Sequence, residues 1–197
     1  EDGENPFWKA TGPELLDVSI TNYCEKRCDF CYRSSDEYGK HIDLDLYEKI
    51  LKSAKAAGVF QIALGGGNPN QHPKFNDILR MTREYGIVPS YTTNGQGMTA
   101  EIYEATRKYG GALAVSWYYP YDEAKNVIEN ASSYEIPVNI HFVIDADNIN
   151  QARELLKEKC LDYVNAIIFL NYKPVRNGNR NVLKKGRKIS KLLEELL

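Results

Sequence analysis

Apolar, β-branched segments alternate with amphipathic segments along most of this 197-residue chain. The apolar segments have the length of strands, and the segments between them repeat apolar residues at helical spacing. This pattern predicts strands over residues 15–21, 60–64, 88–93, 112–118, 138–144 and 166–170. It predicts helices over residues 44–57, 74–85, 99–109, 122–134, 148–159 and 183–197. Gly58, Gly86 and Gly110 each follow one of these helices, where a left-handed C-cap is expected.

Strands that alternate with helices indicate βαβ units and a parallel sheet. Six such units favour an α/β fold of the partial (β/α)6 TIM-barrel type. A doubly wound open sheet is the alternative, because periodicity does not separate the two architectures. In both of them the ligand lies at the carboxyl ends of the strands. The residues that directly follow the predicted strands are therefore the candidates for function.

The composition is that of one globular domain, with 43% apolar and 26% charged residues. This share of apolar residues, in a chain of this length, is enough for a hydrophobic core. No apolar stretch approaches the length of a membrane span, about 20 residues. No signal-peptide pattern opens the chain. Cysteines without a secretory context favour a reducing compartment, so we expect a cytoplasmic protein without a membrane partner.

Three of the four cysteines lie within eight residues, directly after the first predicted strand. Cys24, Cys28 and Cys31 have the spacing C-x-x-x-C-x-x-C. Three thiolates on one short loop can bind three irons of a cubane cluster and leave the fourth iron without a protein ligand. An open metal position is typical of catalytic rather than structural sites. From the spacing alone, a zinc site with His41 as the fourth ligand is the alternative. A disulfide is disfavoured, since only Cys160 remains as a partner.

With the aromatic Phe30 before its last cysteine, this motif resembles the signature of the radical S-adenosylmethionine (radical SAM) enzymes. The resemblance implies that Cys24, Cys28 and Cys31 bind a [4Fe-4S] cluster, whose open iron is chelated by the methionine end of S-adenosylmethionine. It also implies that an external donor reduces the cluster, and that an electron from the cluster then splits the sulfonium C–S bond of S-adenosylmethionine. The 5′-deoxyadenosyl radical formed in this way abstracts hydrogen from a substrate, in an oxygen-sensitive reaction.

The second predicted strand leads into Gly65-Gly66-Gly67-Asn68-Pro69, which resembles the family's Gly-Gly-Glu-Pro segment. In that segment the backbone and the acidic residue receive the methionine amino group, so the resemblance assigns Gly66, Gly67 and Asn68 to the cofactor. Asn68 replaces the glutamate and offers an oxygen without its negative charge. A tight strand–helix turn without a ligand is the alternative interpretation of the glycines.

Polar residues at the later strands complete the predicted cofactor site. Thr93 and Asn94 lie in a Thr-Asn-Gly sequence that is familiar in the family, and Ser116 lies where related enzymes place a polar group near the ribose. Asn139 and His141 alternate with apolar residues on the fifth strand, so they share a face that we expect to be the barrel lumen. A turn or packing role is the alternative for each of them.

The remaining candidates are weaker. The segment 171–178 resembles the family's sixth-strand exit, which lies against the adenine, and Phe30 is expected on the same adenine. Trp117 and the tyrosines at 118, 119 and 121 either wall a substrate pocket or pack in the interior. We interpret His72 and Cys160 as structural.

Charge is distributed unevenly in this chain of net charge −2. Residues 163–193 contain eight Lys or Arg and no Asp or Glu. This basic segment is either a solvated surface or a docking site for RNA, an acidic peptide or another domain. A nucleic-acid partner is disfavoured, because no recognition motif accompanies the basic residues.

We expect residues 1–14 to form an N-terminal arm and residues 15–197 to form one radical SAM core domain. We also expect the chain to lack the cysteine-rich carboxyl-terminal domain of many peptide-modifying members. The predicted function is that of a radical SAM enzyme, with a peptide or protein as the first substrate class, followed by RNA modification or activation of a partner enzyme. A non-catalytic module that binds zinc or an iron–sulfur cluster, for structure or electron transfer, is the alternative from a different class.

Overall fold

A computed structural model of the chain describes residues 12–145 and 148–172. Most of the predicted N-terminal arm lies outside the described residues. So do the predicted helix 183–197, the part of the sixth-strand exit after residue 172 and almost all of the basic segment.

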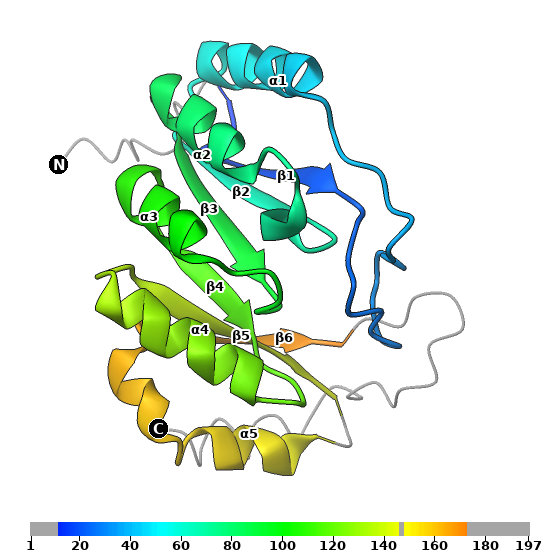
Figure 1. The fold of residues 1–197 in the computed structure, drawn as a ribbon, viewed down its shortest axis with the longest axis vertical. Coiled ribbons are helices and arrows are strands. Elements are labelled where there is room, and N and C mark those ends of the chain that lie inside the picture. Colours follow the sequence, from blue (N-terminus) through cyan, green and yellow to red (C-terminus); the bar gives the residue numbers. More distant parts are fainter. Residues whose placement is uncertain (1–11, 146–147, 173–197) are drawn as a thin grey trace, which may run out of the picture.

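Six parallel strands form one sheet in the order β1-β2-β3-β4-β5-β6, so the spatial order follows the chain (Figure 1). The strands are β1 Leu15–Thr21, β2 Gln61–Gly66, β3 Val88–Thr93, β4 Leu113–Ser116, β5 Val138–Ile144 and β6 Ala166–Asn171. A doubly wound sheet reverses its strand order at a switch point, and this sheet has none. The barrel-type prediction is therefore confirmed and the doubly wound alternative is wrong.

The helices cover one face of the sheet (Figure 1). They are α1 Leu44–Ala56, α2 Phe75–Glu84, α3 Ala100–Tyr109, α4 Asp122–Ser133 and α5 Ile149–Leu155, with the 3₁₀ turns η2 Pro69–Gln71 and η3 Lys159–Tyr163. Asp43 and Thr99 are the N-caps of α1 and α3, and their side chains accept hydrogen bonds from backbone N–H groups in the first turn. No helix of the described part of the chain has the length and apolar character needed to cross a membrane.

Two details of the sequence prediction are wrong. The helix predicted over 148–159 ends at Leu155, because the chain then turns into η3, which packs on α4 and buries Cys160. Gly58 and Gly86 have the expected positive φ, but Gly110 has a φ of −74° and is not a left-handed cap. A Cβ atom at Gly110 would lie 2.7 Å from the carbonyl oxygen of Thr106, so close approach of the backbone explains this glycine.

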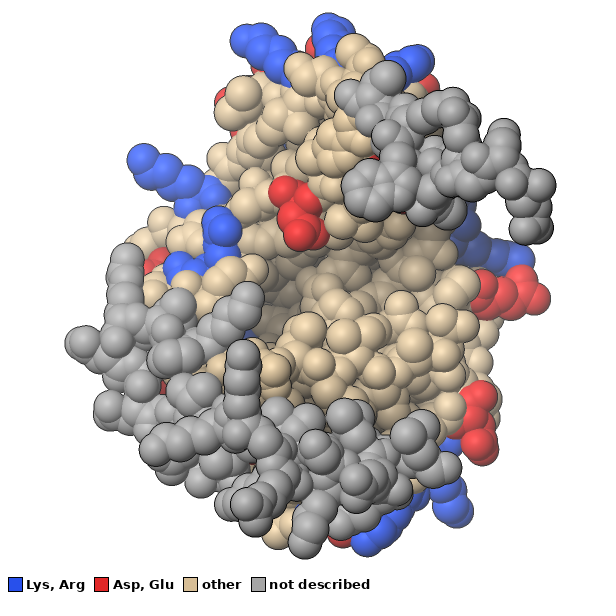
Figure 2. All heavy atoms as spheres, turned by 180° about the vertical axis from the view of Figure 1, so that it is seen from behind, with Lys and Arg blue, Asp and Glu red and all other residues tan. Residues whose placement is uncertain are grey.

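The two faces of the sheet differ in character. On β3 and β5, buried residues such as Tyr91 and Ile140 point toward the helices and form the core with them. The alternate residues, which include Thr92, Asn139 and His141, are half-buried and lie on the opposite face. This second face is hollowed when the molecule is seen from behind (Figure 2). The polar residues of the fifth strand thus share the lumen side of the sheet.

Gly66 lies where the backbone leaves no room for an added methyl group. It ends β2 with a φ of +118°, and a Cβ atom there would lie 1.9 Å from the carbonyl oxygen of Thr21. We expect Gly66→Ala to lower the free energy of unfolding by about 2–4 kcal/mol, through backbone strain and the displaced end of β1. Urea denaturation followed by circular dichroism measures this loss.

Gly65→Ala is the matched control, since a Cβ atom at Gly65 would meet no atom within 4 Å. It should change the free energy of unfolding by less than about 0.5 kcal/mol. An equal loss in both variants would contradict this account of the β2 exit.

Candidate functional site

The cysteine loop, residues 22–41, leaves β1 at the carboxyl edge of the sheet and is tied at its base. Asn22 N–H donates to Lys40 O at 2.8 Å, and Cys24 N–H donates to Asp36 O at 2.9 Å. The two ends of the loop therefore lie side by side, and the segment between them carries the cysteines. This is the edge of the sheet where a parallel α/β fold binds its ligands.

The three thiols of this loop are free but differ in burial. Cys24 is buried, whereas Cys28 and Cys31 are half-buried. Over residues 12–145 and 148–172, no three His, Cys, Asp or Glu side chains are arranged closely enough to hold a metal ion. The three thiols thus share one loop at the carboxyl edge of the sheet. Thiolates repel one another and need a bound metal to gather them, and three soft sulfur donors suit an iron–sulfur cluster or zinc.

His41, the fourth ligand of the zinc alternative, contacts residues other than the cysteines. Its Nδ1 atom lies 2.8 Å from Thr21 Oγ1, and its ring centroid is 5.0 Å from that of His72 and 5.5 Å from that of Tyr23. His72 is buried, accepts from Lys74 N–H at 3.0 Å and bonds Ile42 O at 2.9 Å. The two histidines therefore support the base of the cysteine loop.

The glycine turn after β2 packs directly against the chain that enters the cysteine loop. Gly67 N–H donates to Thr21 O at 2.7 Å, and Asn68 N–H donates to Tyr23 O at 2.9 Å. A Cβ atom at Gly67 would lie 2.1 Å from Tyr23 O, so only glycine permits this approach. Gly65 is different, because its missing side chain leaves open space.

The side chain of Asn68 is 1% exposed and is engaged within the protein. Its Oδ1 atom accepts from Asn94 N–H at 3.1 Å, and its Nδ2 atom donates to Gln96 O at 3.0 Å. The predicted site residues Asn68, Thr93 and Asn94 are thus brought together, because the Thr93 hydroxyl also lies 3.3 Å from Asn68 Oδ1. In this arrangement Asn68 fixes the turn after β3.

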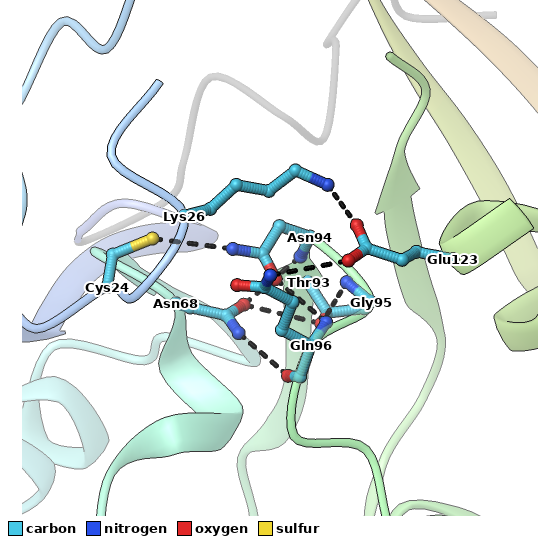
Figure 3. A network of polar contacts seen from close by, with 8 residues as sticks. All are labelled: Cys24, Lys26, Asn68, Thr93, Asn94, Gly95, Gln96 and Glu123. Atoms are coloured by element: carbon cyan, nitrogen blue, oxygen red, sulfur yellow. Dashed lines mark hydrogen bonds and ion pairs between the residues drawn. The ribbon is translucent and has the colours of Figure 1, made fainter. Parts of the chain in front are cut away.

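Asn94 links this turn to the cysteine loop (Figure 3). Its Nδ2 atom donates to Cys24 Sγ at 3.3 Å, and its Oδ1 atom accepts from Gln96 N–H at 2.9 Å. Hydrogen bonds to ligand sulfurs are among the factors that set the potential of an iron–sulfur cluster. The predicted Thr-Asn-Gly sequence therefore places an amide donor on the thiol of Cys24.

Three polar residues of the same region were not predicted as site residues. Asn70 accepts from the Thr93 hydroxyl at 2.7 Å and donates to Gln96 O at 2.7 Å. Gln96 in turn donates to Glu123 Oε1 at 3.3 Å (Figure 3). No local sequence pattern marks these residues, because each contact joins loops that are far apart in the chain.

Tyr118, two residues after the end of β4, packs on the middle of the cysteine loop. Its ring centroid lies 5.3 Å from that of Phe30, in an edge-to-face arrangement, and 4.7 Å from Lys26 Nζ. Burial raises the pKa of the Cys28 thiol, while a hydrogen bond from Tyr118 and the charge of Lys26 lower it. Phe30, which was predicted to lie on the adenine, thus contacts an aromatic residue at the barrel mouth.

The other predicted residues lie on the lumen face. Ser116 is opposite His141 in the register of β4 and β5. His141 Nδ1 lies 3.3 Å from Thr92 Oγ1, and burial lowers the pKa of His141, so its ring is neutral at pH 7. Asn139 Oδ1 accepts from Asn165 Nδ2 at 3.2 Å. These side chains form a polar but uncharged wall that can donate and accept hydrogen bonds.

Comparison with known sequences identifies a family. The sequence model of the Radical SAM superfamily matches residues 18–135, which include the cysteine loop, the glycine turn and strands β2 to β4. The tungsten-containing aldehyde ferredoxin oxidoreductase cofactor-modifying protein of Pyrococcus furiosus is 27% identical over 190 residues, covering 82% of this chain and 52% of that protein. The PqqA peptide cyclase of Ruegeria pomeroyi is 28% identical over 110 residues, covering 55% of this chain and 29% of the cyclase.

Solved structures have the same fold. SuiB of Streptococcus suis bound to S-adenosylmethionine superposes with a TM-score of 0.79 at 20% identity, covering 94% of this chain and 47% of SuiB. SuiB bound to the precursor peptide SuiA gives a TM-score of 0.79 as well, at 21% identity, covering 94% of this chain and 46% of SuiB. The chain spans about half the length of SuiB and of the Pyrococcus protein.

Stability should depend on pH through the histidines. Burial lowers the pKa of His41, His72 and His141, which are all the histidines of the chain. The unfolded chain, with histidine pKa values of about 6.5, then binds more protons than the folded one. The stabilisation from the neutral rings is complete above about pH 6.5 and is lost as the pH falls toward the lowered folded values. Urea unfolding between pH 7.5 and 5.5 measures this decrease.

His72→Gln tests which histidine matters most, because protonation of His72 Nδ1 would break its hydrogen bond from Lys74 N–H. The variant should show a shallower pH dependence than the wild type over the same range. An unchanged slope would exclude His72 as a contributor.

Proposed function

The chain belongs to the radical SAM superfamily, and from this premise we propose that it is a radical SAM enzyme whose [4Fe-4S] cluster is held by Cys24, Cys28 and Cys31. One observation carries this proposal: three free thiols lie on a loop at the carboxyl edge of a parallel sheet, and a buried amide donates to the first of them. The three sulfurs are a donor set that fits such a cluster and leaves one iron for S-adenosylmethionine.

When bound, the cluster and S-adenosylmethionine would together supply a 5′-deoxyadenosyl radical, which no amino-acid side chain can provide. The protein binds, orients and shields these groups. Asn94 holds the thiol of Cys24, and Gly65 leaves room on the lumen face where a side chain would otherwise project. We propose that the backbone at Gly66 and Gly67, together with Asn68 and Thr93, borders the methionine end of S-adenosylmethionine.

The polar side chains on the lumen face are our candidates for contact with the rest of S-adenosylmethionine and with the substrate. Ser116, Asn139 and His141 offer hydrogen-bonding groups there, and the neutral ring of His141 can accept or donate without adding charge. Phe30 reaches the mouth of the barrel beside Tyr118 and is our candidate for contact with the adenine.

A peptide or protein is the substrate class that we propose. Two of the similar proteins are named for peptides, namely the PqqA peptide cyclase and SuiB in its complex with the precursor peptide SuiA. We further propose that an external donor supplies the electron, and that the enzyme acts in the reducing cytoplasm, where free thiols persist. The role of residues 1–14 as an arm and of residues 15–197 as one core domain also stays a proposal.

The deciding experiment is anaerobic reconstitution with iron and sulfide, followed by reduction and detection of 5′-deoxyadenosine formed from S-adenosylmethionine. We expect about four irons per chain, an EPR signal that changes when S-adenosylmethionine is added, and slow cleavage. Cys28→Ala should lose both the cluster and the cleavage. Cys160→Ala, which removes the one cysteine outside the loop, should retain both.

Other outcomes would contradict the proposal. One tightly bound zinc without cleavage would make the chain a structural metal module. Cleavage at the wild-type rate in Cys28→Ala would remove the cysteine loop from the reaction.

Gly65→Val tests the open space on the lumen face. Because a Cβ atom at Gly65 meets no atom within 4 Å, the variant should fold and assemble its cluster. The added side chain would occupy the space proposed for the cofactor, so the affinity for S-adenosylmethionine should fall at least about tenfold, or about 1.4 kcal/mol. Isothermal titration calorimetry of the reconstituted protein measures this, with Gly65→Ala as the smaller step. Equal affinities for wild type and Gly65→Val would remove Gly65 from the site.

A further inference from the structure

An ion pair joins the cysteine loop to helix α4. Lys26 lies between Cys24 and Cys28, and its ammonium group contacts Glu123 Oε2 in the first turn of α4 (Figure 3). The side chain of Lys26 is 11% exposed and that of Glu123 is 30% exposed, so water screens this pair less than a surface pair. A second ion pair among the described residues, between Arg27 and Glu37, is within the loop and more exposed.

This ion pair joins two elements that are well separated in the sheet. The cysteine loop follows β1, whereas α4 follows β4, three strands away in the sheet. The loop therefore extends over the carboxyl ends of β2 and β3 to reach α4, and the polar network around Asn94 lies beneath it (Figure 3). Glu123 is held in place for this contact, because its other oxygen accepts from Gln96 Nε2 at 3.3 Å.

Lys26 also brings its charge close to the thiols. Its Nζ atom lies 4.7 Å from the ring centroid of Tyr118, and Tyr118 in turn contacts Cys28 and Phe30. A positive charge at this place stabilises any negative charge that develops on the sulfurs and the metal that they bind. Glu123 compensates that charge through its ion pair with the largely buried ammonium group.

We propose that Glu123 is a positioning residue for the cysteine loop: through Lys26 it holds the loop over the strand ends and sets the net charge next to the cluster. Glu123 forms no described contact with the three cysteines, and its ion pair with Lys26 is its direct contact with the cysteine loop. This inference rests on the proposed function, because it concerns the reduction potential of the cluster. It goes beyond that function by adding a residue from α4, outside the cysteine motif and the strand ends.

The two charges of the pair should move the potential in opposite directions. Reduction of the cluster adds one negative charge. Glu123→Gln leaves Lys26 uncompensated, so the midpoint potential should become more positive than in the wild type. Lys26→Met removes the positive charge, so the potential should become more negative. The double variant should lie between the two. EPR-monitored redox titration of the reconstituted proteins measures all four values.

Asp122→Asn is the matched control. Asp122 is the neighbouring acidic residue in the same first turn of α4, is exposed and does not pair with Lys26. The control removes the same charge from the same helix end, so its potential should remain at the wild-type value. Shifts of equal size in Asp122→Asn and Glu123→Gln, or shifts of the same sign in Glu123→Gln and Lys26→Met, would overturn the proposal. A contact that only stabilises the fold predicts no such opposition of signs.

A measurement on the metal-free protein separates this inference from the proposed function. Hydrogen–deuterium exchange of residues 22–34 should become at least about threefold faster in Lys26→Met and stay unchanged in Asp122→Asn, because only the former releases the loop. Unchanged exchange in Lys26→Met would remove the positioning role. If the wild type assembles no [4Fe-4S] cluster, the proposed function fails, while the exchange experiment still decides whether the pair holds the loop.

Discussion

The site depends on one close approach between two stretches of backbone. The chain leaving β2 lies so near the chain leaving β1 that Gly67 N–H and Asn68 N–H donate to the carbonyl oxygens of Thr21 and Tyr23. Any side chain at Gly66 or Gly67 would overlap those oxygens. Two backbone hydrogen bonds therefore fix the residue just before Cys24, and the orientation of the cysteine loop follows from them. Gly66 and Gly67 therefore allow the backbone contact that positions the loop. Of the three glycines in this turn, Gly65 is the one that leaves space for a ligand.

Around this contact, the buried polar side chains are amides and hydroxyls rather than charged groups. Asn68, Asn70, Thr93 and Asn94 are all buried and satisfy one another across two strand exits. A buried carboxylate at position 68 would have to be paired or protonated, whereas the amide donates and accepts at once. The asparagine in place of the family's glutamate thus suits a network in which the same side chain must hold the turn after β3. Among the described residues of Figure 3, the Lys26–Glu123 pair brings charge to the outer side of this network.

Features that depend on residues close together in the sequence could be predicted from it. Strands β1, β3 and β5 begin and end at the predicted residues, because each has alternating or continuous apolar residues bounded by turn signals. The place of the cysteine loop after β1, and of Asn68, Thr93 and Asn94 at neighbouring strand ends, likewise follows from their order along the chain, while their roles stay a proposal. The end of α5 was not predicted, since burial of Cys160 against α4 is a tertiary effect. Glu123 could not be found either, because it meets Lys26 across 97 positions of sequence.

The unequal burial of the three cysteines suggests how such a loop can be both specific and adaptable. Cys24 is fixed by the backbone contact beneath it, by its own N–H bond to Asp36 O and by the amide of Asn94. Cys28 and Cys31 lie farther along the loop, half-buried and joined by a backbone hydrogen bond from Cys31 N–H to Cys28 O. One thiol is therefore held by buried contacts, while the other two are half-buried. Binding of a metal by Cys24 therefore costs little conformational entropy. The entropy cost of bringing Cys28 and Cys31 to the same metal is part of the free energy of metal binding. The Lys26–Glu123 pair lies between Cys24 and Cys28 in the sequence, so it restrains the segment that joins the first cysteine to the other two.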